Sequence, residues 1–420
     1  MFRVLTPLGL LLCLGSQVGA DSSTTAPSWP RFRGPNGTGV SADKNIPIEF
    51  SDQSNVLWKT AIPGTSNSSP IVWGNRIFLH SASSDGKERF LICLNTDGKV
   101  LWSKSVSGSQ AKAHGKTTLA SSTPATDGER IYLVFWDGSE LTLCAYDFEG
   151  IQVWKYPLGK FVSQYGAAAS PMVHDGKVYY SHDQDGSSVL LALNAKSGQV
   201  VWQKSRLPHK ACYSVPFLLE RDGRLEVIAT STGGLGAYNP QTGAEIWTWK
   251  FAKVPNRTVA CPVWGHGMIF ATHGGGSNGG VVAVKIGDKG DVSETNLAWE
   301  YGTGFPYVPS MQILGEHLYF VNDIGIAGCC VAKTGKKVWT ERLRGAVSAS
   351  PILIDGKIYA AGEDGFVSVF PAAPTFRLLA RNNMGESLLA TPAVSEGRLY
   401  IRGKTHLFCI SKKPATEERK

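Results

Sequence analysis

One sequence unit recurs eight times along this 420-residue chain, and this repeat constrains the fold more than any other feature. Each copy begins near a proline, runs through short apolar segments separated by turns, and in most copies ends at a tryptophan. A repeat length in the forties with four apolar segments per copy indicates an all-β chain, a β-propeller built from four-stranded antiparallel sheets. The opening prolines are Pro70, Pro124, Pro171, Pro216, Pro262, Pro309, Pro351 and Pro392. The closing tryptophans are Trp102, Trp154, Trp202, Trp247, Trp299 and Trp339.

The third copy shows how one repeat forms a blade. Asp175-Gly176, Asp185-Gly186 and Ser197-Gly198 are turn sequences, because glycine adopts the positive φ that tight hairpin turns need. The segments between them are rich in β-branched and aromatic residues, which favour strands. Four strands are therefore expected, at residues 171–173, 177–180, 189–193 and 199–202.

The two ends of the repeat array predict how the ring closes. The last copy has only three strand segments, and a spare closing segment at residues 55–59, which contains Trp58, precedes the first proline. We expect this N-terminal strand to complete the C-terminal blade, because closure removes the exposed edge of an open sheet. The ring then has eight blades. The seventh copy has Phe376-Arg377-Leu378-Leu379 in place of a tryptophan segment, which leaves a seven-bladed ring as the alternative.

Residues 1–20 are typical of a signal peptide, with Arg3 ahead of an apolar stretch at 8–14 and a small-residue cleavage site ending at Ala20. The apolar stretch is too short to span a bilayer, and no transmembrane segment is expected elsewhere. Cys13 has no small residue directly before it, which disfavours a lipoprotein site. The sequence therefore predicts a periplasmic or secreted protein, cleaved near Ala20.

The mature chain divides into three parts. Residues 21–54 are expected to form an extended strap, residues 55–411 the propeller, and residues 412–420 a charged tail. The low share of charged residues, 18%, fits a turn-rich all-β chain.

The repeat resembles that of the pyrroloquinoline-quinone-like propeller superfamily. The resemblance rests on a Ser-Pro opening, an Asp-Gly turn, an Ala-Leu-Asn strand, a Ser/Thr-Gly turn and a tryptophan, and it covers residues 55–411. The segment from Trp29 to Val40, with the sequence WPRFRGPNGTGV, is similar to the leader of exported propellers described as BamB-like. The resemblance implies either quinone-dependent (PQQ) alcohol or sugar dehydrogenase chemistry or non-enzymatic scaffolding, as in outer-membrane protein assembly. Fold alone does not choose between them.

The quinone alternative requires a carboxylate base, a Ca²⁺ site rich in oxygen ligands, and cations for the cofactor. Asp183 and Asp185 are the candidate acids, but both stand at a hairpin turn, where aspartate commonly bonds the local backbone. Adjacent cysteines accompany the quinone in some members of the superfamily, and Cys329-Cys330 matches superficially. These two lie within a predicted strand, so their side chains point to opposite faces. No cofactor is therefore predicted, and PQQ with Ca²⁺ remains the alternative.

Other catalytic patterns are weaker. The nine histidines show no metal-ligand spacing, and we identify no nucleophile elbow or catalytic triad. The glycine-rich segment at 274–280 lacks the Gly-Lys-Ser/Thr of a phosphate loop and is interpreted as a hairpin tip.

Strand order predicts that the connections between blades share one face with the hairpins between second and third strands, which we call the loop face. The opposite, tight-turn face carries short turns. Binding residues usually lie on such longer loops. Four consecutive connections contribute a set of cations that we call the basic crescent: Lys104, Lys112, Lys116, Lys155, Lys160, Lys204, Arg206, Lys210, Lys250, Lys253 and Arg257.

The basic crescent is either a site for an anionic partner or a solvated rim. The second interpretation has weight because hairpins of the same face contribute acids. These are Asp85, Glu88, Asp137, Glu140, Asp183, Asp185, Asp323, Glu363 and Asp364. A second candidate site is the axial mouth, where aromatic residues and one arginine either hold a ligand or plug the funnel. Its residues are Tyr165, Tyr213, Arg257 and Tyr307.

The leading hypothesis is an exported, non-enzymatic propeller that binds an envelope protein or an anionic polymer through its loop face. Its support is the intact repeat, the export signal and the missing metal and base constellation. Nucleic acid is not an expected partner of an exported protein, and a monomer is favoured. Lys112, Lys116 and Lys210 are the expected exposed contacts, beside the residues of the mouth.

Overall fold

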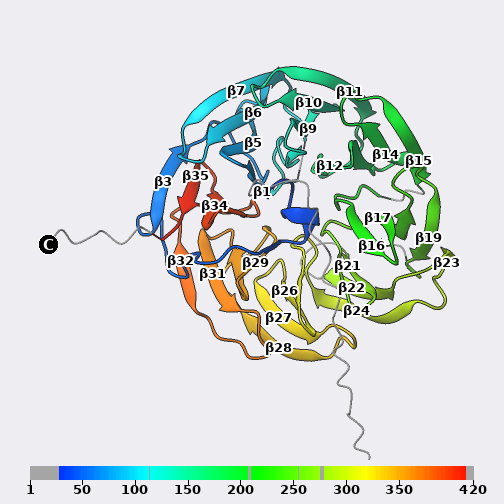
Figure 1. Ribbon diagram of the computed structural model, residues 1–420. Helices are drawn as coiled ribbons and strands as arrows, with labels where there is room; N and C mark the ends of the chain where they lie inside the picture. Colours follow the sequence, from blue (N-terminus) through cyan, green and yellow to red (C-terminus); the bar gives the residue numbers. More distant parts are fainter. Residues whose placement is uncertain (1–27, 113, 207–209, 254, 275–278, 413–420) are drawn as a thin grey trace, which may run out of the picture.

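The computed structural model describes residues 28–112, 114–206, 210–253, 255–274 and 279–412. These residues form eight sheets arranged in a ring around a central axis (Figure 1). The prediction of an eight-bladed, all-β propeller is confirmed, and the seven-bladed alternative is wrong. The predicted signal peptide and residues 413–420 of the tail lie outside the described residues.

The strands of each blade run outward from the axis in chain order. The innermost strands are β4 (Ile71–Trp73), β8 (Ala125–Thr126), β12 (Met172–His174), β16 (Phe217–Arg221), β20 (Val263–Gly265), β25 (Gln312–Leu314), β29 (Ile352–Ile354) and β33 (Ala393–Ser395). The second strands are β5 (Arg76–Ala82), β9 (Arg130–Trp136), β13 (Lys177–His182), β17 (Arg224–Ser231), β21 (Met268–His273), β26 (His317–Val321), β30 (Lys357–Ala361) and β34 (Arg398–Arg402).

The outer half of each blade consists of its third and fourth strands. The third strands are β6 (Glu88–Asn95), β10 (Glu140–Asp147), β14 (Ser188–Asn194), β18 (Gly234–Tyr238), β22 (Gly279–Lys285), β27 (Ile326–Val331), β31 (Phe366–Pro371) and β35 (His406–Ile410). The outermost strands of the first seven blades are β7 (Val100–Ser107), β11 (Gln152–Lys160), β15 (Val200–Arg206), β19 (Glu245–Lys250), β24 (Leu297–Phe305), β28 (Lys337–Arg342) and β32 (Ala380–Asn383).

The ring closes as predicted. Strand β3 (Val56–Ala61) pairs antiparallel with β35, and Trp58 stands opposite Cys409. The first strand after the strap therefore serves as the outermost strand of the eighth blade, and this leaves no unpaired blade at the seam.

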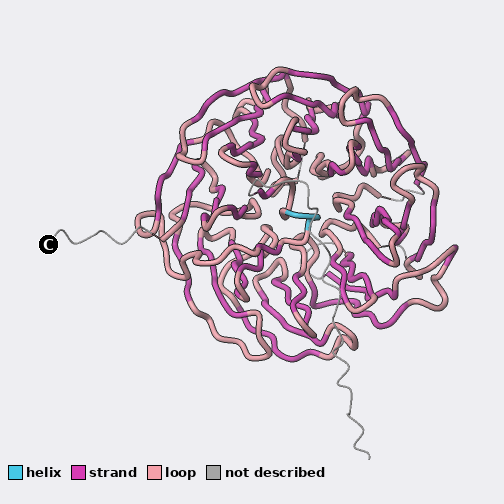
Figure 2. Tube along the Cα trace, viewed as in Figure 1, coloured by secondary structure: helices cyan, strands magenta, loops and turns pink. Residues whose placement is uncertain are grey.

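The strap adds features that the repeat does not predict. Strand β1 (Ser28–Trp29) pairs antiparallel with β4, and β2 (Val40–Ser41) pairs parallel with β29. Between them, the 3₁₀ helix η1 (Pro35–Gly37) lies at the centre of the ring, where Figure 2 shows it in cyan. A third addition, β23 (Gly290–Asp291), pairs parallel with β19. Three blades thus have five strands instead of the expected four.

The core lies between neighbouring blades. Tyr132 and Leu143 of the second blade, for example, pack in one cluster with Val178 and Leu191 of the third. No helix in the described part of the chain combines the length and hydropathy needed to cross a membrane.

The periodic tryptophans join each blade to the next one. The indole Nε1 of Trp202 donates to the carbonyl of Pro240, in the turn before the outermost strand of the fourth blade, at 2.9 Å. Equivalent bonds to the following blade are made by Trp58, Trp102, Trp154, Trp299 and Trp339. Trp247 differs, because its Nε1 donates to the buried Glu226 carboxylate at 3.0 Å.

The seventh copy departs from the predicted pattern. The segment 376–379 is not a strand, and the outermost strand is β32, directly after it. Phe376 instead packs on Trp339, with ring centroids 5.1 Å apart. The strap contacts this blade where the other blades have a tryptophan segment. The Asn382 side chain accepts from the Phe50 amide and donates to the Ile48 carbonyl, and Phe50 is buried.

The sixth copy is offset from the prediction by two residues. The Cys261 amide donates to Ser310 Oγ, and the Ser310 amide donates to Ser350 Oγ, each at 3.0 Å. In the sixth copy, Ser310 therefore occupies the position that Ser350, directly before Pro351, occupies in the seventh copy. Met311, and not Pro309, stands at the opening position of this copy.

Candidate functional site

The loops and hairpins share a face, as predicted from strand order. Asp185, in the hairpin between β13 and β14, accepts from the Ala211 amide of an interblade loop at 2.8 Å. Asp323, in the equivalent hairpin of the sixth blade, accepts from the Tyr307 amide at 2.7 Å and from Val308 at 3.1 Å. Hairpin carboxylates thus fix the interblade loops around the mouth of the ring.

Arg257 is the centre of this mouth. It is only 1% exposed, and its Nη1 lies 2.9 Å from Asp185 Oδ1, with a further bond to the Ala211 carbonyl at 3.1 Å. Its guanidinium carbon also lies 4.8 Å from the centre of the Tyr165 ring, a cation–π contact. Burial raises the pKa of Asp185, but bonds from Arg257 and Ala211 outweigh this and leave that pKa lowered. The arginine is therefore held by an ionised partner.

The other two aromatic residues of the mouth are also engaged. The Tyr213 hydroxyl lies 2.8 Å from Ser163 Oγ and donates to the Gly166 carbonyl at 3.0 Å. Burial raises its pKa to about 12 and also raises the pKa of Tyr307, so both phenols stay protonated. The structure therefore brings together all four predicted residues of the mouth, because Arg257 stacks on Tyr165 and lies near Tyr213 and Tyr307.

A long connection crosses this mouth. Lys116, in the loop between β7 and β8, reaches Glu363 in the hairpin between β30 and β31, with Nζ 2.6 Å from Oε1. Ser348 Oγ donates to the same carboxylate oxygen at 2.6 Å. His114 of this loop also contacts Tyr165, with ring centroids 5.3 Å apart. The loop thus links the second blade to the seventh.

The residues that the sequence suggests for a quinone site do not form one in the structure. They are Asp183, Asp185 and the adjacent pair Cys329-Cys330. Asp183 is buried and pairs with Arg206 at 3.3 Å, and burial raises its pKa to about 6. Cys329 and Cys330 are free thiols that pack into different cores, which confirms that they point to opposite faces. Among the described residues, no three His, Cys, Asp or Glu side chains cluster with metal-binding geometry. This donor set does not provide the oxygen-rich ligands that Ca²⁺ requires.

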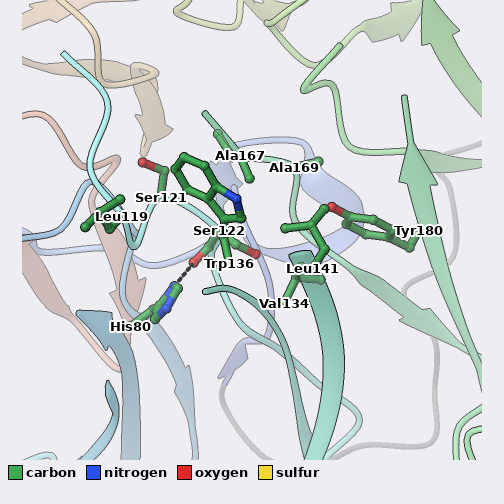
Figure 3. A pocket seen from close by; sticks show the side chains of 11 residues that line it. His80, Leu119, Ser121, Ser122, Val134, Trp136, Leu141, Ala167, Ala169 and Tyr180 are labelled. Atoms are coloured by element: carbon green, nitrogen blue, oxygen red, sulfur yellow. Dashed lines mark hydrogen bonds between the residues drawn. The ribbon is translucent and has the colours of Figure 1, made fainter. Parts of the chain in front are cut away.

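A small and narrow pocket lies between the first three blades. It is lined by His80, Ser122, Trp136 and Tyr180, among others, and it has no space for a water molecule (Figure 3). His80 Nδ1 lies 3.0 Å from the Ser122 carbonyl, and burial lowers the pKa of this histidine to about 3. A neutral histidine packed in this way is part of the core.

The basic crescent is less uniform than the sequence indicates. Arg206 and Arg257 were expected on exposed loops, but they are buried and paired with Asp183 and Asp185. Lys116 and Lys250 are exposed but pair with Glu363 and Asp291, each at 2.6 Å. Several other lysines are exposed and take no part in the ion pairs found among the described residues. These are Lys112, Lys155, Lys160, Lys210 and Lys253.

Two arginines of the strap were missed by the sequence analysis. Arg31 and Arg33 are buried at the ring axis, where they contact the Pro216 and Met311 carbonyls. The available signal was their occurrence within the WPRFRGPNGTGV segment, outside the repeat. Repeat periodicity carries no information on a segment that occurs once.

Comparisons with known proteins agree with this architecture. A family model described as "Outer membrane protein assembly factor BamB" matches residues 48–139 and 92–326. The protein of that name from Shewanella oneidensis is 31% identical over 170 residues, which are 37% of this chain and 39% of that protein. The match therefore spans well under half of that relative's length.

Two solved structures are similar in fold. BamB from Moraxella catarrhalis has a TM-score of 0.62 at 15% identity, covering 86% of this chain and 99% of the other. A quinohemoprotein alcohol dehydrogenase from Comamonas testosteroni has a TM-score of 0.66 at 13% identity, covering 93% of this chain and 82% of the other. Identities this low show the fold alone.

Proposed function

Because the chain belongs to the family described as outer membrane protein assembly factor BamB, we propose that it is an exported, non-enzymatic scaffold. Its partner is a protein or an anionic polymer of the cell envelope, bound through the loop face. The mature protein is a periplasmic or secreted monomer, released by cleavage near Ala20. Tyr165, Tyr213, Tyr307 and the exposed lysines of the basic crescent form the contact surface.

The observation that carries this proposal is the state of the mouth. Arg257 is buried against Asp185 and Tyr165, and the loop between β7 and β8 is tied to the seventh blade through Lys116 and Glu363. A mouth filled in this way offers a contoured surface rather than a pocket for a small substrate. Partner-binding residues on propellers lie on the connecting loops, which here project from this face.

The two faces can be tested separately. A photoreactive amino acid in place of Lys210, on the loop face, should cross-link an envelope component when the full protein is irradiated in intact cells. The matched control replaces Lys196, which is also exposed but lies in the tight turn between β14 and β15. Equal cross-linking from both positions, or cross-linking from position 196 alone, would contradict binding through the loop face.

The rival function, quinone-dependent oxidation, has its own test. Purified protein is mixed with the quinone and Ca²⁺, and absorbance and dye-linked alcohol or sugar oxidation are recorded. Stoichiometric quinone binding with turnover would overturn the non-enzymatic proposal. We expect neither, because the candidate carboxylates already face arginines.

A further inference from the structure

The strap bonds the inner edges of several blades but leaves that of the eighth blade open. In the seventh blade, the amide of Leu353, the middle residue of β29, donates to the Gly39 carbonyl at 2.8 Å. In the fourth blade, Asn36 Oδ1 accepts from the Leu218 amide at 2.9 Å, and Asn36 Nδ2 donates to the Leu218 carbonyl at 2.7 Å. The strap also bonds the innermost strands of the first and second blades. Amide and carbonyl groups of the strap thus satisfy the inward-facing backbone of four blades.

Val394 holds the equivalent place in β33 of the eighth blade. It pairs with Leu399, and the neighbouring pair, Ser395 and Arg398, flanks a two-residue turn. The pair beside such a turn exchanges hydrogen bonds and the next pair does not, so the N–H and C=O of Val394 point away from β34. Neither group bonds any other residue that the structure describes. Strand β33 therefore presents an open backbone edge towards the axis.

This edge faces a cavity of about 330 Å³, a volume within the range of pockets that hold ligands. The cavity lies between β1 on the first blade and β2 on the seventh. Its lining combines apolar and polar side chains, those of Trp29, Pro35, Val40, Ser28, Ser41 and Asp43. Because β33 is three residues long, its edge has space to pair with about two or three residues of an extended chain.

The cavity opens on the tight-turn face. Ser28 stands opposite Trp73, next to the turn between β4 and β5. Asp43 Oδ1 accepts from the Gly397 amide, in the turn between β33 and β34, at 2.9 Å. Pro35 and Val40 are exposed, so a ligand can enter from solvent. The loop face is at the other end of the axis, so this site goes beyond the function proposed above and stands or fails independently of it.

Asp43 gives the cavity a negative charge. It is half-buried and takes part in none of the ion pairs between described residues. Its other oxygen, Oδ2, accepts from the Ser41 hydroxyl at 2.9 Å, and each carboxylate oxygen can accept a second bond. A lysine or arginine side chain would supply a charge-assisted bond. Residues 21–27, which directly precede the cavity, contain neither, so this cation has to come from another chain.

We propose that this cavity binds a short extended segment of a partner polypeptide, with a lysine or arginine side chain placed at Asp43. The segment adds to β33 as a strand, through hydrogen bonds with the backbone of Val394. In strand addition, backbone bonds supply affinity and the side chains supply selectivity. Here Trp29 and Val40 favour apolar side chains, and Asp43 selects the cation.

Short peptides test this site on the purified mature protein. The probe is a labelled five-residue peptide with the sequence valine-threonine-lysine-threonine-valine, acetylated and amidated at its ends, and fluorescence anisotropy measures its binding. Glutamate in place of the lysine should weaken binding about ten-fold or more, the usual effect of losing a bond to a charged group. Methylation of the peptide's backbone nitrogens should abolish binding, because it removes the donors that pair with β33.

Two variants test the protein side of the contact. Val394→Pro removes the inward-facing donor without removing a bond to β34, and it should abolish binding. The matched control is Val173→Pro, at the middle position of β12 in the third blade, which should bind as the wild type does. Asp43→Asn keeps an oxygen for the Gly397 amide but should remove the preference for lysine over glutamate. If Val394→Pro fails to fold, the methylated peptide tests the same bonds on the wild type.

Three results would overturn the proposal. One is equal binding, or equal lack of binding, of the lysine, glutamate and methylated peptides. Another is binding that Val394→Pro and Asp43→Asn both retain in full, with the preference for lysine unchanged. The third is binding that appears only after residues 21–27 are deleted, because that segment of the chain itself would then occupy the cavity.

Discussion

At the scale of single residues, the repeated glycine in the turn before the outermost strand is explained by the tryptophan of the preceding blade. A Cβ on Gly243 would lie 2.6 Å from Trp202 Cδ2, and Gly243 has a φ of 69°. Equivalent close approaches occur between Gly198 and Trp154 and between Gly98 and Trp58. The glycine and tryptophan therefore recur with one period because they form one contact.

Gly243→Ala should destabilise the protein more than Gly223→Ala. Gly223 has nearly the same φ, 70°, but a Cβ there would meet nothing within 4 Å. It therefore reports the backbone cost alone, about 1–2 kcal/mol. Gly243→Ala should add overpacking against Trp202, typically about 1–3 kcal/mol. Urea denaturation of both variants measures the difference, and equal losses would show that the indole moves away freely.

Trp202→Ala should lower the free energy of unfolding by about 3–5 kcal/mol, the usual loss for a buried tryptophan. Trp202 is 7% exposed, packs against Tyr179 and donates to the Pro240 carbonyl. Chemical denaturation followed by fluorescence measures the loss. A loss below about 1 kcal/mol would mean that the side chain is not a joint between blades.

His80 should make stability depend on pH. Burial holds its folded pKa at about 3, below an unfolded value of about 6.5, so the folded state binds its proton less readily. Its contribution is complete above pH 6.5 and is lost as the pH falls from 6.5 towards 3. Relative to His80→Gln, the wild type should lose up to about 1.4 kcal/mol per pH unit in that window. Parallel Tm curves for the two proteins between pH 7 and 4 would contradict this.

At the scale of elements, the strap and the closing strand differ in how far the sequence predicts them. The closing segment at 55–59 carries the repeat's own tryptophan pattern, so β3 was predictable. Strands β1 and β2 are two residues long, and their positions depend on partners elsewhere in the chain, such as Leu353 for Val40. Such pairings leave no periodic signal, and the same is true of Phe50 filling the seventh blade.

Deleting residues 21–60 should therefore cost far more stability than deleting 412–420. The first deletion removes β3 from β35, exposes the edge of the eighth blade and removes the strap from the axis. Differential scanning calorimetry of the two truncated proteins and the full mature chain provides the comparison. Equal melting temperatures would show that the ring closes without its N-terminal strand.

At the scale of the whole molecule, the sequence predicts the number of blades and which loops share a face, because both follow from a repeat. It does not predict which charges are free. Arg206 and Lys112 look alike in the sequence, yet one is buried against Asp183 and the other is exposed. The acids that neutralise the basic crescent lie in other loops, such as Glu363 for Lys116, so only the folded ring reveals the pairing.

The surface that attracts an anionic partner is therefore narrower than the full basic crescent, and reversing it should separate binding from folding. Changing Lys112, Lys160, Lys210 and Lys253 to glutamate should leave Tm nearly unchanged, since exposed substitutions typically cost about 0.5 kcal/mol or less. Retention of the partner should fall strongly. Wild-type retention should weaken as salt rises, because attraction fades beyond a screening length of about 8–10 Å near physiological ionic strength.

The matched control changes Lys99, Lys196, Lys333 and Lys336, which are exposed in turns of the tight-turn face and carry the same total charge. If both sets weaken retention equally, net charge alone governs binding. If neither set nor salt affects it, the contact is apolar, and Tyr165, Tyr213 and Tyr307 of the mouth are the next residues to change.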